Sequence, residues 1–405
     1  EYQRNGFDVS KIMAHPSFQK FKANDIYRLI RGQADRIHTI ILTNQEAVVL
    51  NSDMQKLVTG CLETPDMGIQ MPFPLLSDLF RGIKLKTMFC TGMLSNAGKS
   101  RFMFRLLACL ALVHKQKVCV LLNEMTIERM KLCLLTTVIN NDEFKELHGV
   151  DIQKREKELA LGLYRDLKGD YIYRLKDDQG NVTESLPDYM KRLRGQSEEF
   201  NKVMQVAEWV EQQTDGLIYA KDISNGYDDK TLEFEIRKAN MVHGVEYFFY
   251  DTLKQETKLL SEWSALKATT TRLTELTREL KCFIYASIQL TDDTNFIKPD
   301  ELVSSNIAAS KQLKHVVDNL ILCKEIAEHE KPHYRYIEAN KDFGASVEKE
   351  LLPDKRYYIF NVDKNRDGAR KKIIYEINLD LNTWTECGEL KRMPPQKKDG
   401  KKSKE

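Results

Sequence analysis

One stretch of the sequence limits the possible folds more than any other, namely residues 87 to 104, TMFCTGMLSNAGKSRFMF. Residues 88 to 90 are apolar and typical of a strand, whereas apolar side chains recur at helical spacing over residues 101 to 113. The residues between these segments are small enough to let backbone N–H groups close around phosphates. The stretch therefore predicts a strand, a phosphate-binding loop and a helix in succession.

The predicted loop ends on Gly98, Lys99 and Ser100. In such a loop the lysine reaches the β- and γ-phosphates of ATP, and the hydroxyl holds Mg²⁺. The usual first glycine, five residues before Gly98, is replaced by Met93, and a glycine comes one residue earlier, at Gly92. The same tripeptide can begin an ordinary helix, but the flanking strand and helix favour a nucleotide site. Its predicted residues are Ser95, Asn96, Ala97, Gly98, Lys99, Ser100 and Arg101.

The composition is that of a globular protein. The 405 residues are 42% hydrophobic and 30% charged, enough for one large domain or two ordinary ones. Because 62 Lys and Arg residues nearly balance 60 Asp and Glu residues, any contact with nucleic acid must come from a local basic surface.

The cysteines and the lengths of the apolar runs indicate in which cellular compartment the protein is expected. The eight cysteines include no CxxC pair, and those at 90, 109, 119, 282 and 323 fall inside predicted strands or helices. Buried thiols in a reducing cytosol are therefore expected rather than disulfides or a zinc site. The sequence has no apolar run of membrane-spanning length and no secretory signal, which predicts a cytoplasmic protein without membrane contact.

Three further apolar runs end on polar side chains. VCVLLNEM ends beside Glu124, VEYFFYD ends on Asp251, and CFIYASIQL ends beside Gln289. Continuous apolar runs predict parallel strands buried on both faces, whose carboxyl ends face the ligand at one edge of the sheet. Coming after a phosphate loop, the second run is typical of a strand whose aspartate positions Mg²⁺. Gln289 is either an ordinary strand-end amide or a sensor of the γ-phosphate or the attacking water.

The rest of the chain alternates predicted helices and strands. A helix is predicted over residues 263 to 280, and a polar, loop-like segment over residues 325 to 356. Further strands are predicted over residues 319 to 323, 357 to 362 and 372 to 377. This alternation predicts an α/β protein with a mainly parallel, twisted sheet flanked by helices.

Residues 140 to 215 are highly charged and predict a helical insertion on the surface. Within it, helices are expected over residues 154 to 167 and 188 to 213, and a turn over residues 176 to 181, KDDQGN.

The N-terminal and C-terminal segments of the chain differ in composition from the predicted ATPase domain between them. A helix over residues 45 to 62 places Leu50, Met54, Leu57, Val58 and Cys61 on one face, which packs either on its own domain or on a neighbouring subunit. The last residues, KKDGKKSKE, are lysine-rich and predict a flexible tail. The expected organisation is a short helical segment over residues 1 to 65, a P-loop ATPase domain over 66 to 386 and a tail over 387 to 405.

Taken in order, these motifs resemble the RecA-like ATPase domain of hexameric replicative helicases of the DnaB type. The resemblance runs from about Gly68 to Glu386, and the chain departs from the family in four places. Met93 replaces the usual first glycine of the loop, and residues 140 to 215 are longer than the family norm. The loop TDDTNFIKP after Gln289 is more acidic than the basic loop of the family, and no primase-recruiting domain is recognisable in residues 1 to 65. The matching segments are GIQMPFPLLSDLFRGIKLKTM, GMLSNAGKS, LLNEM, YFFYD, YASIQL, SKQLKHVVDNLILC and DKNRDG.

The resemblance implies a role for each matching residue. Lys99 and Ser100 hold phosphate and Mg²⁺, and Glu124 polarises the attacking water. Asp251 orders the metal, and Gln289 senses the γ-phosphate.

The two cations of DKNRDG, Lys364 and Arg366, are implied to be fingers that reach into the neighbouring subunit's site; spacing alone favours a solvated hairpin end. The resemblance thus implies an ATP- and Mg²⁺-dependent homo-oligomer, a hexameric ring that moves on single-stranded DNA, with replication or phage proteins as partners. Lys254, Lys258 and Lys298, in loops after two strands, are the predicted DNA contacts.

Two alternatives stay open. One is a RecA-like ring whose ATP turnover drives assembly or partner switching without unwinding. The other is a loader or scaffold that binds nucleotide and hydrolyses it slowly.

Overall fold

The computed structural model describes residues 10, 14, 16, 18–22, 25–32, 50–213, 216–223, 229–253, 262–304, 313–339 and 346–393. The chain divides into two compact units, Glu1–Asp66 and Met67–Glu405. The predicted nucleotide site lies in the second unit.

The first unit contains short helices. They are η1 (Phe18–Lys20), a helix at residues 25–32, and α3 (Met54–Glu63). The predicted start of the helix over residues 45 to 62 is wrong, because α3 begins only after Asp53, whose φ is 56°. Residues 45–49 lie outside the described residues. Leu57 and Val58, on the predicted apolar face of α3, are each 61% exposed.

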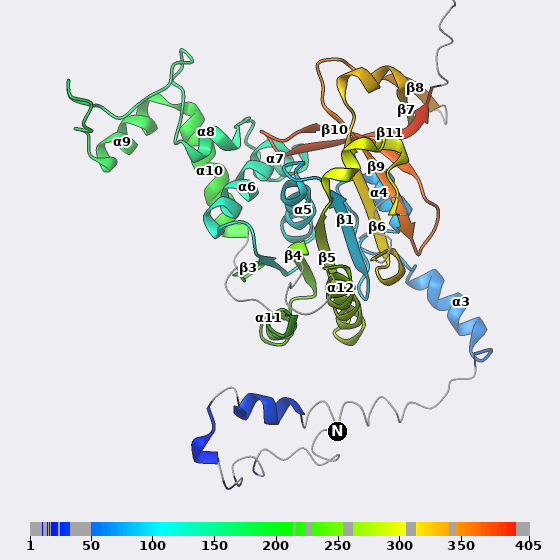
Figure 1. Ribbon diagram of the computed structural model, residues 1–405. Helices are drawn as coiled ribbons and strands as arrows, with labels where there is room; N and C mark the ends of the chain where they lie inside the picture. The colour runs from blue at the N-terminus through cyan, green and yellow to red at the C-terminus, as the bar shows by residue number, and fades with distance from the viewer. Residues whose placement is uncertain are drawn as a thin grey trace, which may run out of the picture. The chain divides into compact units, whose positions relative to one another are not determined.

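The second unit is built on one sheet of eleven strands, in the order β3-β2-β4-β5-β1-β6-β9-β10-β11-β7-β8 (Figure 1). The first six strands in this order pair in parallel, and every pairing from β6 onward is antiparallel. The strands are β1 (Met88–Met93), β2 (Val118–Leu122), β3 (Ile218–Asp222), β4 (Tyr247–Leu253), β5 (Phe283–Gln289), β6 (Asn319–Glu325), β7 (Tyr334–Ala339), β8 (Ser346–Glu350), β9 (Tyr357–Asn365), β10 (Lys372–Asn378) and β11 (Thr383–Arg392).

Helices cover both faces of the parallel half of the sheet. Phe89 of β1 packs in one apolar cluster, and its neighbours Met88 and Cys90 pack in a second cluster on the opposite face. All residues of β1, β2 and β4 are buried, because each successive side chain meets a helical layer. The predicted α/β fold is thus confirmed. The first cluster contains α4 (Pro74–Phe80), α5 (Lys99–Ala108) and α6 (Ile127–Asn140), and the second contains α11 (Asp229–His243) and α12 (Glu262–Glu279).

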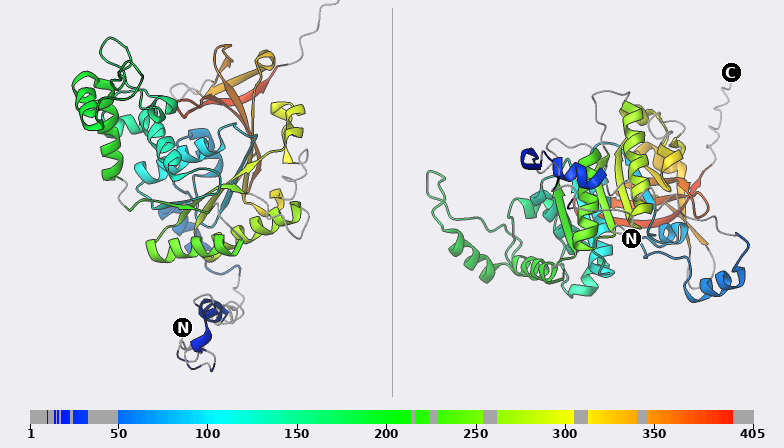
Figure 2. Two further views of the ribbon diagram at one scale, coloured as in Figure 1. Left: turned by 60° about the vertical axis from the view of Figure 1, so that its left-hand side comes forward. Right: turned by 90° about the horizontal axis from the view of Figure 1, so that it is seen from below.

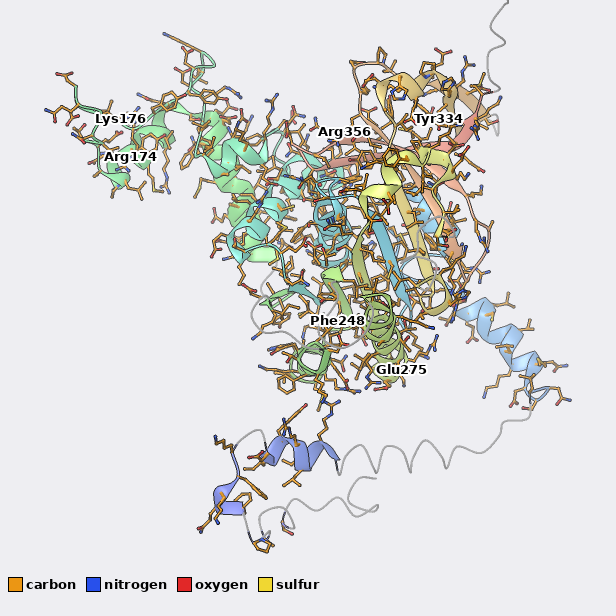
Figure 3. The ribbon with its side chains drawn as sticks, in the orientation of Figure 1. Arg174, Lys176, Phe248, Glu275, Tyr334 and Arg356 are labelled. Carbon is orange, nitrogen blue, oxygen red and sulfur yellow. The ribbon has the colours of Figure 1, made fainter. Side chains whose placement is uncertain are left out.

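Between β2 and β3 the chain forms the insertion. Its helices are α7 (Asp142–His148), α8 (Glu156–Ala160), α9 (Leu186–Gln196) and α10 (Glu198–Gln213). Val203 and Val206 of α10 pack against Val138 of α6. The part that carries α9 extends away from the sheet (Figure 2). Arg174 and Lys176 lie on this arm, far from Phe248 in the sheet (Figure 3).

The insertion departs from the sequence prediction in two places. The helix predicted over residues 154 to 167 covers only Glu156–Ala160, because Gly162 turns the backbone with a φ of 62°. The helix predicted over residues 188 to 213 is two helices, which meet at Ser197. The predicted turn at residues 176 to 181 is present, since Asp177 and Asn181 pair through their backbones.

Four strands were not predicted, namely β3, β7, β8 and β11. The segment 325–356 is not a loop: it contains the helix η6 (Glu328–His333) and the hairpin of β7 and β8. These strands lie toward the ends of the sheet and are only partly buried, so they lack a continuous apolar run. Because β11 extends to Arg392, residues 387 to 392 belong to the sheet and not to the predicted tail; residues 394–405 lie outside the described residues.

The remaining elements are short. The π-helix η2 (Cys109–Val113) continues α5, and two 3-10 turns, η3 (Asp292–Phe296) and η4 (Pro299–Glu301), follow β5. The five cysteines predicted to be buried are buried, and all eight are free thiols. In the described part of the chain, no helix combines the length and the apolar character needed to cross a membrane.

Candidate nucleotide-binding site

The predicted phosphate loop joins the last residue of β1 to the first residue of α5. Gly98 precedes α5 with a φ of 93°, a backbone conformation that favours glycine. A Cβ atom there would also lie 2.6 Å from the side chain of Leu379, which would have to move. Met93 is still in β1 and pairs with Gln289, which explains why the usual glycine position is not a turn here. Gly92 serves packing instead, since a Cβ there would meet Leu322 at 2.8 Å.

The first residue pair of the site joins the loop to β4. The Ser100 hydroxyl donates a hydrogen bond of 2.5 Å to Oδ2 of Asp251, and Asp251 is fully buried. Both groups are hard oxygen donors, which is the donor type that Mg²⁺ prefers. Ser100 and Asp251 therefore fit a magnesium ion, as the sequence predicts.

The second oxygen of Asp251 is held by two hydroxyls that the sequence reasoning missed. Ser287 of β5 donates to Oδ1 at 2.6 Å, and the Thr252 hydroxyl lies 2.9 Å from the same atom. Thr252 also lies 3.3 Å from Oε2 of Glu124. Its single proton serves one carboxylate at a time, so Thr252 links the predicted metal ligand to the predicted base. Serine and threonine are common in buried strands, so no local pattern distinguishes these two.

Asn123 fixes the end of β4 from the neighbouring strand. Its side chain accepts from the Thr252 amide at 2.8 Å and donates to the Thr252 carbonyl at 2.7 Å. It also donates to the Tyr250 hydroxyl at 3.2 Å. These bonds hold the residue after Asp251 against β2, directly before Glu124. The motif LLNEM contains Asn123, but only the strand pairing assigns it this role.

Lys99 is the first residue of α5, directly after the phosphate loop, and 7% of its surface is exposed. Its Nζ donates to the Leu94 carbonyl at 3.3 Å. Burial lowers the pKa of Lys99, and the carboxylates of Glu124 and Asp251 oppose that shift. The ammonium therefore sits where an additional anion compensates its desolvation.

These residues surround a cavity of about 480 Å³. Gln289 lines it together with Glu124, so the predicted sensor and base face the same space. Ala97 instead packs against the apolar core. The lining residues are Ser95, Asn96, Gly98, Lys99, Ser100, Arg101, Glu124, Met125, Arg129, Cys133, Glu156, Gln289 and Leu379.

The insertion contributes to the same cavity, which the sequence did not predict. Glu156, the first residue of α8, forms an ion pair of 2.6 Å with Arg101, in the first turn of α5. The Glu156 amide donates to the Asp380 carbonyl at 3.0 Å, which fixes this end of α8 beside the cavity. The insertion is therefore attached to the nucleotide site through Glu156.

Lys364 and Arg366 lie elsewhere. Arg366 pairs with Asp318 at 2.6 Å, and Asp318 accepts from the amide of Met88, the first residue of β1. The phosphate loop follows the other end of β1, so roughly 20 Å of strand separates Arg366 from it. Lys364 donates to the Lys314 carbonyl at 2.5 Å, and burial, followed by the charge of Arg366, lowers its pKa. Neither cation reaches the cavity of its own chain.

A sheet whose parallel half carries a phosphate loop after β1, Glu124 after β2 and Asp251 within β4 defines a RecA-like P-loop fold. The fold is that of the DnaB-type helicases. The chain is similar to a solved ATPase domain, with a TM-score of 0.58 and 12% identity over 84% of this chain and 99% of that one. It is also similar to a DnaB-like replicative helicase solved for its interactions with primase. The TM-score is then 0.61, at 12% identity, over 95% of this chain and 76% of that one. The sequence matches no family profile, and no curated protein is similar to it in sequence.

Proposed function

We propose that this protein is an ATP-hydrolysing motor that assembles as a ring, a hexamer by analogy, moves along single-stranded DNA and unwinds duplex DNA. One observation carries the proposal: beside the phosphate loop, the hydroxyls of Ser100 and Thr252 lie within hydrogen-bonding distance of Asp251, and Thr252 also lies within that distance of Glu124. A fold of the DnaB type supports a helicase-type ATPase.

In the proposed reaction each residue has a defined task. Lys99 neutralises charge that develops on the transferred phosphate, and Glu124 orients the attacking water. Ser100 and Asp251 would hold Mg²⁺, which would supply positive charge that offsets the negative charge of the phosphates. Gln289, which lines the same cavity as Glu124, responds to the γ-phosphate and carries that response into the loop after β5.

The position of Lys364 and Arg366 supports the proposed ring. Lys364 and Arg366 lie at the edge of the sheet opposite the phosphate loop, and so cannot serve the site of their own chain. A head-to-tail ring brings that edge of one subunit to the loop edge of the next. We therefore propose that both cations act on the neighbouring subunit's nucleotide.

Single-stranded DNA is proposed to contact the loops that follow β4 and β5. Lys254 and Lys258 lie outside the described residues. Lys298 lies in the described loop after β5, and its side chain is 58% exposed. A cytoplasmic location, and partners among replication or phage proteins, are part of the same proposal.

A second function is favoured by the acidic loop after β5. Asp292 and Asp293 are exposed there, next to the proposed DNA path. In this alternative the ring is a switch, and ATP turnover drives assembly or partner exchange without DNA.

The test is ATPase activity with and without single-stranded DNA, followed by unwinding of a forked duplex with ATP. Stimulation and strand separation are expected. If DNA neither binds nor stimulates turnover at low salt, while ATP is hydrolysed, the switch replaces the motor. Loss of turnover in Glu124→Gln would then distinguish the switch from a scaffold that hydrolyses ATP slowly.

A further inference from the structure

We propose that Phe296 is a stacking platform for a base of single-stranded DNA; this inference rests on the proposed function and names how the loop after β5 contacts its ligand. Phe296 ends η3 and is 92% exposed, more than any other large apolar side chain in the described part of the chain. An aromatic ring in this state has its whole face available to a ligand.

Hydrogen bonds fix the backbone on both sides of Phe296, so its side chain is exposed although the loop is ordered by these contacts. The ammonium of Lys324, on β6, donates to the carbonyls of Thr294 and Asn295, each at 2.9 Å, and to that of Ile297. These carbonyls lie on both sides of Phe296. Burial lowers the pKa of Lys324, as expected of an ammonium enclosed by backbone oxygens.

The residues that follow anchor the loop to the sheet. Tyr334 of β7 donates from its hydroxyl to Asp300 at 2.7 Å, and Lys372 donates to the Asp300 carbonyl at 2.5 Å. Tyr334 is marked in Figure 3. Thr294 is also buried, with only 1% of its surface exposed. The side chain of Phe296 is therefore presented outward by a backbone fixed before and after it, which lowers the entropy lost when a ligand binds.

The charges near Phe296 favour a base over a phosphate as its ligand. Asp292 and Asp293 are exposed on the same 3-10 turn, and Lys298 is partly engaged with Glu301 at 3.9 Å. Carboxylates repel the phosphate backbone, whereas a phenyl ring stacks on the neutral face of any base. The contact is therefore expected to be tolerant of sequence and less sensitive to salt than a phosphate contact.

The loop is also connected to the nucleotide site. It begins directly after β5, whose last residue, Gln289, lines the nucleotide cavity. The Leu290 amide donates to the Met93 carbonyl at 2.9 Å, so the start of the loop is tied to the end of β1. A change at Gln289 on hydrolysis can thus shift the platform and the base that it holds.

The experiment compares two single-stranded oligonucleotides of equal length, one of thymidines and one of abasic deoxyribose phosphates, by fluorescence anisotropy. We expect wild type to bind the thymidine strand more tightly than the abasic strand. Phe296→Ala should weaken binding of thymidine by about 5- to 150-fold, the equivalent of one stacked base, and leave abasic binding unchanged. Phe296→Trp should restore affinity, and its fluorescence should be quenched by the thymidine strand.

Phe234→Ala is the matched control, because it removes a phenyl ring that is 37% exposed on α11, at a distance from this loop in the sequence; it should leave both affinities unchanged. An unchanged thermal midpoint of Phe296→Ala shows that the variant is folded. The inference is overturned if Phe296→Ala binds thymidine like wild type, or weakens both strands equally. If wild type binds neither strand, the proposed motor itself fails, and the inference about Phe296 fails with it.

Discussion

The hydroxyl of Ser100 donates to the carboxylate of Asp251 across 151 positions of the chain, over a distance of 2.5 Å. β5 lies between β4, which contains Asp251, and β1, which leads into the loop before Ser100. Ser287 of β5 holds the other oxygen of Asp251. Asp251→Asn should abolish the response of ATP turnover to Mg²⁺, because an amide offers one weak oxygen where the carboxylate offers two. Titration of turnover with Mg²⁺ measures this. Ser287→Ala, which removes a hydroxyl from the same carboxylate but no proposed metal ligand, should retain the response.

Substitutions of Lys99 and of Glu124 should have different effects on ATP binding and on ATP hydrolysis. Lys99→Ala should weaken ATP binding, since the ammonium is the proposed counter-ion of the γ-phosphate. Glu124→Gln should keep ATP affinity and lose turnover by about 10²- to 10⁴-fold, the usual contribution of a general base. Binding of a fluorescent ATP analogue and steady-state hydrolysis check both variants. Wild-type behaviour of either one contradicts its assigned role.

The ion pair of Arg101 and Glu156 should weaken nucleotide binding in the wild type. Glu156 places a carboxylate in the cavity and occupies the guanidinium of Arg101, so Glu156→Gln should raise ATP affinity about fivefold, equivalent to ~1 kcal/mol. Glu143→Gln is the matched control. Glu143 pairs with Arg105, which lies on α5 like Arg101, but neither Glu143 nor Arg105 lines the cavity. Calorimetry with ATP measures both. Equal affinities of wild type and Glu156→Gln would show that the pair is purely structural.

Arg366 should act in trans. Arg366→Ala should lower turnover by roughly 10³- to 10⁵-fold with ATP affinity largely intact, because a guanidinium on transition-state charge contributes that much. Its side chain is 50% exposed, so the pair with Asp318 can open at a subunit interface. Mixing Arg366→Ala with Lys99→Ala should restore part of the activity, since some interfaces then join an intact loop to an intact finger. No recovery under proven subunit exchange would exclude the shared site.

The pair of helices behind β4 should make stability depend on pH. Glu233 of α11 accepts from Arg272 of α12 at 2.8 and 3.0 Å, and from Arg237 at 2.8 Å. Burial opposes its charge, but these hydrogen bonds outweigh burial and lower the pKa of Glu233 to about 2. A lowered pKa in the folded state means that the stabilisation is complete above the ordinary value of 4.5 and is lost as pH falls toward about 2.

Glu233→Gln should therefore lower the urea midpoint at neutral pH, and its difference from wild type should shrink as pH falls through this range. Glu275→Gln is the control. Glu275, marked in Figure 3, also pairs with Arg272, but its side chain is 52% exposed. It should change the midpoint little. A Glu233→Gln difference that does not vary with pH would contradict the assigned charge.

Sequence periodicity predicted the parts of the site that depend on neighbours along the chain. The runs over β1, β2, β4 and β5 are mostly apolar, which predicted strands covered on both faces. Parallel strands end at one edge, which alone brings Glu124 and Gln289 toward the loop of Lys99. The edge strands β3 and β8 escaped prediction because partly exposed strands need no such run.

Only the tertiary structure decided which polar groups meet. Thr252 bridges Asp251 and Glu124 because β2 pairs with β4 in one register, and Glu156 enters the cavity because the insertion folds back to Asp380. Likewise, Lys324 fixes the outward position of Phe296 from a different strand. Such contacts join residues that are far apart in the sequence. They depend on the register of paired strands and on how distant segments pack together, and the local spacing of residue types encodes neither. The sequence by itself therefore determined the fold class and the edge of the sheet where the proposed chemistry lies, and the packing of distant segments determined its connections.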